Sequence, residues 1–190
     1  MDVHLWISND LESVRAKLSD SVLRMVPAQR WLEHVDEGGS SIAHLLLHIA
    51  RHHDLAVTTA IRNHPPLFAV HREALGLAGT APSAGLPERE DPALSDAILL
   101  EPLLGYFDAV FVATASWLDD IGSMALDTIP DTTRRLAGKA SLSVDEVPWL
   151  HRMWVDKPVW WLLQWPVIGH GHAHVGEAIS VRNRMGLSPF

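Results

Sequence analysis

Apolar residues recur along this chain at spacings of three and four positions, which is the period of an amphipathic α-helix. The first such stretch covers residues 3–25 and ends before Pro27. Its apolar stripe consists of Leu11, Val14, Leu18, Val22 and Met25. Alternating apolar and polar runs, which mark half-buried strands, are nearly absent. The pattern therefore predicts an all-α fold.

A second helix is predicted over residues 41–63. Ser40 precedes it as a suitable N-cap, and Pro65 and Pro66 stop it. The segment IAHLLLHIA in its first half is apolar nearly all round, apart from two histidines. A helix with this pattern is buried on most sides.

Two further long helices are predicted in the second half of the chain. One covers residues 96–121, and the other begins at Pro158 and ends before Gly186. Pro166 lacks an amide hydrogen, so we expect it to kink the last helix. Tryptophans gather around the start of this helix, and we expect most of them in the core. They are Trp149, Trp154, Trp160, Trp161 and Trp165.

The remaining segments are predicted to be connections. Residues 64–95 form a long connection, and residues 122–142 form another. Ser143 and Glu146 have the spacing of a capping box, which predicts a short helix over residues 144–154. Four long helices in a single domain, residues 1–190, pack best as a four-helix bundle. The 64–95 connection is long enough to cross over the end of such a bundle.

Composition excludes several classes of protein. The chain has no cysteine, so thiolate metal sites and disulfides are impossible. A net charge of −8 without a basic stripe argues against nucleic acid or a membrane surface as partner. Residues 158–176 are uncharged, but their glutamine and histidines favour a buried helix over a membrane span. The start of the chain does not resemble a signal peptide, so we expect a cytoplasmic location.

The chain carries 12 histidines, far more than a core needs. His170 and His174 lie four apart in the last predicted helix, so both imidazoles project from one face. Such a pair can bind one divalent metal ion, as in the HExxH motif. The segment HGHAH lacks the internal glutamate of that motif, so its hydrolase mechanism does not carry over. His172 falls on roughly the opposite face of the helix.

The second predicted helix offers a third imidazole. His44, His48 and His52 recur every four residues along one face. His48 lies between Leu47 and Ile49, so its ring needs a buried partner, either a metal ion or a backbone carbonyl. His52 has charged neighbours and is interpreted as solvated, whereas the direction of His44 is left open.

One histidine of the second helix and the HxxxH pair of His170 and His174 together make a candidate metal site of three imidazoles. Three neutral imidazoles suit Zn, Ni, Fe or Mn and leave coordination positions open for water or substrate. Glu177 follows His174 by three residues. Its carboxylate could orient a ligand or act as a base, or it could be a solvated charge.

Two segments resemble the DinB-like superfamily. GGSSIAHLLLHIARH is similar to the second helix of that family, and HGHAHVGEAISVRNRMG is similar to its last helix. The match assigns the family's three metal ligands to His48, His170 and His174. The chain departs from the family pattern at Glu177, where glutamine is more usual, and in its tryptophan-rich segment.

The resemblance implies a four-helix bundle with a three-histidine metal site, often in a homodimer. It also implies relatedness to bacillithiol or mycothiol transferases and to mycothiol-dependent maleylpyruvate isomerase. A metal-dependent transferase that activates a low-molecular-weight thiol for attack on a small electrophile is therefore the leading hypothesis. A metal-dependent hydrolase and a non-enzymatic helical bundle are the alternatives.

Overall fold

A computed structural model describes residues 3–35, 39–121 and 123–190 of the chain. Every regular element within these ranges is helical, which confirms the predicted all-α class. No helix in the described ranges has the length and apolar character needed to cross a bilayer.

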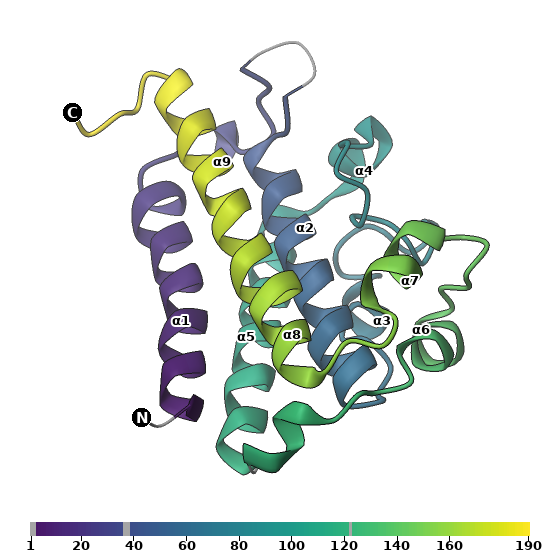
Figure 1. Ribbon diagram of the computed structural model, residues 1–190. Helices are drawn as coiled ribbons and strands as arrows, with labels where there is room; N and C mark the ends of the chain where they lie inside the picture. Colours follow the sequence, from purple (N-terminus) through teal and green to yellow (C-terminus); the bar gives the residue numbers. More distant parts are fainter. Residues whose placement is uncertain (1–2, 36–38, 122) are drawn as a thin grey trace.

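Four long helical stretches form the body of the protein (Figure 1). They are α1 (Val3–Leu18) with η1 (Ser19–Leu23), α2 (Ile42–Asp54) with η3 (Leu55–Ile61), α5 (Leu100–Asp120), and α8 (Val159–Leu163) with η5 (Gln164–Gly169) and α9 (His170–Arg184). Helix α1 packs against α5 and α9, and α2 packs against the same two helices. The four stretches therefore close into a helical bundle around one core.

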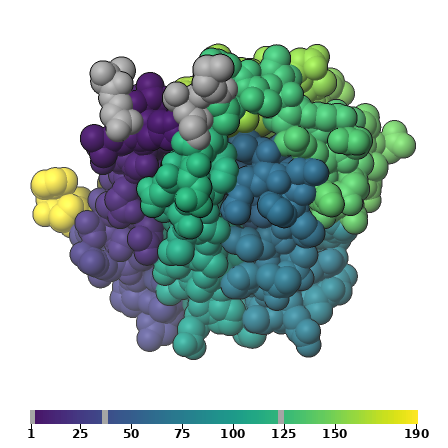
Figure 2. All heavy atoms as spheres, turned by 90° about the horizontal axis from the view of Figure 1, so that it is seen from below, coloured from purple at the N-terminus to yellow at the C-terminus, as the bar shows by residue number. Residues whose placement is uncertain are grey.

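The packing inside the bundle is tight where α1 meets α9. A Cβ atom added at Gly171 would lie 2.9 Å from Cγ1 of Val14, which is fully buried. Figure 2 shows the bundle from below, where α1, α5 and the residues that follow α2 form adjoining bands. The closeness at Gly171 brings the first turns of α9 into the interior.

Two predicted boundaries were wrong. The third long helix begins at Leu100 instead of residue 96, because the chain is extended at Ile98 and Leu99. The preceding residues form a separate short helix, α4 (Pro92–Ala97). The helix α7 (Pro148–Trp154) begins four residues later than predicted, with its proline in the first turn.

The predicted capping box between Ser143 and Glu146 is present. The Ser143 amide donates to Oε2 of Glu146 at 2.8 Å, and the Glu146 amide donates to the Ser143 hydroxyl at 3.3 Å. These contacts close a turn ahead of α7 instead of starting the helix. The segment 122–142, predicted as a connection, contains α6 (Thr132–Ala140), whose N-cap is Asp131.

Two features of the last long helix concern Pro166 and the tryptophans. Around Pro166 the helix continues as the π-helical segment η5, whose wider turn accommodates a residue without an amide hydrogen. Of the five tryptophans expected mostly in the core, Trp154 is fully buried and Trp149 and Trp161 pack against the core, whereas Trp160 and Trp165 are nearly half exposed.

The connection between α2 and α5 crosses the bundle, contains α3 (Phe68–His71), and returns along α2. We call residues 82–90 of this connection the strap. The N-cap of α2 is Ser41 instead of the predicted Ser40, and this residue and side chains of α2 hold the strap along its length. Arg51 donates to the carbonyls of Ala84 (2.9 Å) and Pro82 (2.6 Å). His48 bonds the Gly85 carbonyl (2.9 Å), and His52 bonds the Leu86 carbonyl (3.1 Å). The Ser41 amide donates to the Glu90 carboxylate (2.6 Å).

Gly85 is the point of closest approach between the strap and α2. Its φ of +76° lies in the left-handed region, and an added Cβ would be 2.8 Å from Cγ of Leu47. Only glycine adopts this conformation without strain and leaves room for the leucine. Glycine at this position therefore allows the Gly85 carbonyl to reach the ring of His48.

Candidate metal centre

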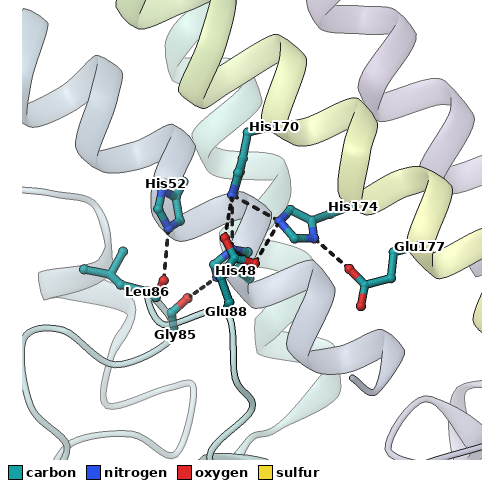
Figure 3. Close-up of polar contacts among 8 residues, drawn as sticks. All are labelled: His48, His52, Gly85, Leu86, Glu88, His170, His174 and Glu177. Carbon is teal, nitrogen blue, oxygen red and sulfur yellow. Dashed lines mark hydrogen bonds and ion pairs between the residues drawn. The ribbon is translucent and has the colours of Figure 1, made fainter. Parts of the chain in front are cut away.

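Three imidazoles converge between α2 and α9 (Figure 3). His48 comes from the middle of α2, and His170 and His174 come from the first two turns of α9. Nε2 of His170 lies 3.2 Å from Nε2 of His48 and 3.1 Å from Nε2 of His174. The structure thus brings together the three histidines singled out in the sequence.

These separations match those of nitrogens that share one cation. Two nitrogens about 2.1 Å from the same zinc ion lie about 3.0 Å apart in octahedral geometry and about 3.4 Å apart in tetrahedral geometry. The observed separations of 3.1 and 3.2 Å fall between these values. The three residues therefore fit a divalent transition metal by distance.

The hydrogen bonds of the outer ring nitrogens fix two of the tautomers. Nδ1 of His48 donates to the Gly85 carbonyl at 2.9 Å, and Nδ1 of His174 donates to Oε2 of Glu177 at 2.9 Å. Carbonyl and carboxylate oxygens accept only, so in each neutral ring the proton sits on Nδ1 and Nε2 carries a lone pair. Two lone pairs therefore face Nε2 of His170.

Hydrogen bonds among the three rings cannot satisfy every ring nitrogen of this cluster. A proton on Nε2 of His170 can be shared well with only one of the two lone pairs. Nδ1 of His170 is buried and has no hydrogen-bond partner among the described residues. A cation that accepts all three Nε2 lone pairs would satisfy this side of the cluster, with the hydrogen of His170 on Nδ1.

Burial keeps the rings of His48 and His170 neutral. Together with the neighbouring His170 and His174, it lowers the pKa of His48 to about 3. Burial likewise lowers the pKa of His170 to about 3, again with a contribution from His174. Neutral imidazoles at physiological pH are the form that binds a metal ion.

Glu88 of the strap completes the cluster. Its carboxylate oxygens lie 3.7 Å from Nε2 of His48, 3.8 Å from Nε2 of His170 and 3.5 Å from Nε2 of His174. One ligand atom from each of the four residues fits within 4.8 Å of the others. A carboxylate that faces nitrogen lone pairs is repelled by them, unless a cation lies between.

Sequence analysis did not identify Glu88. It lies 40 residues after His48 in an irregular connection, so no helical spacing relates it to the other ligands. Its side chain is 74% exposed, in contrast to the buried imidazoles. Glu88 is therefore the carboxylate that faces the three Nε2 atoms, and it is the part of the cluster that is open to solvent.

The interpretation of His52 as solvated was wrong. His52 is only 4% exposed, its Nε2 bonds the Leu86 carbonyl at 3.1 Å, and its ring centroid lies 4.4 Å from that of His170. Burial holds its pKa well below the usual value. The strap covers this face of α2 and replaces solvent. His44 is buried as well, and its ring stacks on His48 at 5.6 Å.

Comparisons with known proteins identify the fold but no activity. No protein-family model and no curated protein matches the chain. Among solved structures, the chain is similar to a conserved protein from Enterococcus faecalis, with a TM-score of 0.71 and 19% sequence identity. The similarity covers 98% of this chain and 99% of the other.

Proposed function

We propose that this chain is a metal-dependent enzyme of the DinB-like type. His48, His170 and His174 would hold one divalent transition metal ion, and Glu88 would be a fourth, replaceable ligand. The observation that carries the proposal is the convergence of two nitrogen lone pairs and an exposed carboxylate on one buried point. Zn, Ni, Fe and Mn all suit three imidazoles and a carboxylate.

The surrounding residues have distinct tasks in this proposal. Gly85 and Glu177 hold the rings of His48 and His174 through their Nδ1 hydrogens, so that the Nε2 lone pairs point inward. The buried rings of His44 and His52 exclude water from the α2 side of the cluster. Access from solvent is therefore on the side of Glu88.

A divalent cation in this site would supply Lewis acidity, which lowers the pKa of a thiol that binds it. Glu88 would accept the thiol proton on a carboxylate oxygen, because its carboxylate is close to all three rings and open to solvent. The sulfur would then form a bond to an electrophilic carbon, and the leaving group would depart with its electron pair. The family resemblance supports a low-molecular-weight thiol as the nucleophile.

Elemental analysis of the untagged protein tests the metal site. We expect about one equivalent of a transition metal in the wild type and its loss in His48→Ala and His170→Ala. His172→Ala is the matched control, because His172 lies between the two ligands on α9 but outside the cluster. A wild-type protein that retains no metal after incubation with Zn²⁺ or Ni²⁺ and desalting would refute the proposal.

The transferase activity needs a second measurement. Metal-loaded protein is mixed with mycothiol or bacillithiol and 1-chloro-2,4-dinitrobenzene, and the thioether product and chloride are followed. We expect Glu88→Gln to lower the rate by about 10²-fold or more, since it removes the proton acceptor. A metal-loaded protein that instead hydrolyses activated esters without thiol would identify a hydrolase.

A further inference from the structure

A cavity of about 330 Å³ lies beside the strap, separate from the metal centre. Its walls come from His44 of α2, from residues 80–89, and from the start of α4. None of the four side chains of the candidate metal centre lines it. The volume lies within the range typical of small-molecule sites.

His44 presents an unused polar atom to this part of the protein. The residue is 5% exposed, and its Nε2 is buried without a hydrogen-bond partner among the described residues. An unpaired buried polar nitrogen costs about 1–3 kcal/mol relative to a paired one. His44 lines the cavity, so a rotation of its ring toward a ligand there would give this nitrogen the missing partner.

The strap provides a free positive charge at the same cavity. Residues 88–91 are all charged, and the three acidic ones have fixed contacts. Glu88 faces the imidazoles, Glu90 bonds Ser41 and Ser95, and Asp91 caps α4 by accepting from Ala93. Arg89 lines the cavity and has no charged or hydrogen-bonding partner within the described part of the chain.

The rest of the lining is mainly apolar, with the exception of Asp91, whose carboxylate already accepts from the Ala93 amide. The other residues are Ala81, Ala84, Pro87, Ala93 and Leu94, together with Gly85 and the hydroxyl-bearing Thr80 and Ser83. We infer that the cavity binds a small, mainly apolar carboxylate that carries one further hydrogen-bonding atom. The carboxylate pairs with Arg89, the further atom bonds Nε2 of His44, and the body of the molecule packs on the apolar wall.

The site shares two residues with the surroundings of the metal centre. The ring of His44 stacks on that of His48, and Gly85 both lines the cavity and accepts the Nδ1 hydrogen of His48. Binding in the cavity does not require a metal ion, so it can be tested independently of the proposed activity.

Calorimetric titration of metal-free protein tests the inference. The probes are 4-hydroxybenzoate, 4-hydroxyphenylacetate and 3-(4-hydroxyphenyl)propionate, which vary the distance between the charge and the hydroxyl. We expect at least one to bind saturably. Its uncharged amide analogue should bind about tenfold more weakly, and its analogue without the hydroxyl about fivefold more weakly.

Variants assign the two contacts. Arg89→Gln should weaken the best probe about tenfold and leave its amide analogue unaffected. Arg152→Gln is the matched control, an exposed arginine that does not line the cavity. His44→Phe keeps an aromatic ring and should remove the preference for the hydroxyl, and circular dichroism checks its fold.

Three results would overturn the inference. The first is that none of the three probes binds. The second is that the best probe binds equally well to Arg89→Gln and Arg152→Gln. The third is that binding occurs only in metal-loaded protein and is lost in His170→Ala, because the carboxylate would then be a ligand of the cation. Retained binding in metal-free His170→Ala supports the cavity even if the metal proposal fails.

Discussion

Helix α2 carries two buried polar groups six residues apart, and they differ in how they are satisfied. Asp54 is fully buried and accepts from the Leu67 amide (3.0 Å), the Phe68 amide (2.8 Å) and the Tyr106 hydroxyl (2.9 Å). His48 is equally buried, but its Nε2 lone pair faces other ring nitrogens. The protein's own donors satisfy the first group, whereas the second keeps a lone pair that a cation would satisfy.

This difference separates structural from functional burial. A buried carboxylate with three donors fixes the start of α3 and the position of α5 against α2. A buried imidazole cluster with inward lone pairs keeps donor atoms available for a ligand. The following predictions test whether the two groups respond differently to mutation, chelation and pH.

Asp54→Ala should have the largest effect on stability. It leaves two backbone amides and the Tyr106 hydroxyl without an acceptor in the core, so we expect a loss of about 3–5 kcal/mol. Urea denaturation measures it, with the exposed Asp119→Ala as control. The loss should be the same with and without chelator. A loss below about 1 kcal/mol would mean that Asp54 does not hold α3.

Removal of the metal ion should be next in size. Bound metal at 100- to 1,000-fold above its dissociation constant stabilises the folded state by about 3–4 kcal/mol. Chelation should therefore lower the melting temperature of the wild type and leave that of His48→Ala unchanged. If chelator shifts both proteins equally, the ion is bound elsewhere.

Acid should destabilise the metal-free protein. The unfolded chain binds protons on histidine below about pH 6.5, whereas His48 and His170 in the folded state stay neutral to about pH 3. The contribution of these two rings to stability is therefore complete above about pH 6.5 and is lost as the pH falls. Between pH 7 and 5 we expect the free energy of unfolding to fall by about 2 kcal/mol for each ring. His48→Gln should reduce the slope of stability against pH, measured by urea titrations.

Gly85→Ala should have a smaller effect that links the strap to the metal centre. The positive φ costs a non-glycine residue about 1–2 kcal/mol, and the added Cβ meets Leu47. We expect reduced stability together with weaker metal binding, because the carbonyl that holds His48 moves. Gly79→Ala is the control, since an added Cβ there meets nothing within 4 Å. Unchanged metal affinity would show that the carbonyl does not orient His48.

The smallest expected effect is that of Glu177→Gln. The side chain is 42% exposed, so stability without metal should change little. Loss of the carboxylate that accepts from Nδ1 of His174 should weaken metal binding about tenfold. A competition titration with a metal indicator measures this, and Glu73→Gln at an exposed position serves as control. Equal metal affinities of the wild type and Glu177→Gln would show that the Glu177 carboxylate does not hold the ring of His174.

The sequence predicts those parts of the molecule that depend on helical periodicity. The all-α class and the pairing of His170 with His174 follow from residues that recur on one face of a helix, whereas the choice of His48 as their partner came from the family resemblance. Whether the three histidines bind a metal ion stays a prediction. The short helix α6 was missed because its sequence TTRRLAGKA has no long apolar stripe.

The partners supplied by irregular backbone could not be predicted. His52 looks solvated in the sequence because its neighbours are polar, and nothing in the sequence around Asp54 indicates that its carboxylate is buried. Their actual partners are a carbonyl of the strap, 34 residues away from His52, and amides at the start of α3. Carbonyls and amides belong to every residue, so a sequence contains no signal of which one will reach a buried side chain.

The π-helical segment η5 ends where the first metal-site histidine of α9 begins. Successive residues of an α-helix are rotated by about 100° around its axis. Deletion of one residue from η5 would therefore turn both His170 and His174 about a quarter of the way around α9, away from α2. The direction in which the two imidazoles project thus depends on the length of a neighbouring segment that supplies no ligand. A single-residue deletion in that segment would abolish the site although every histidine is still present.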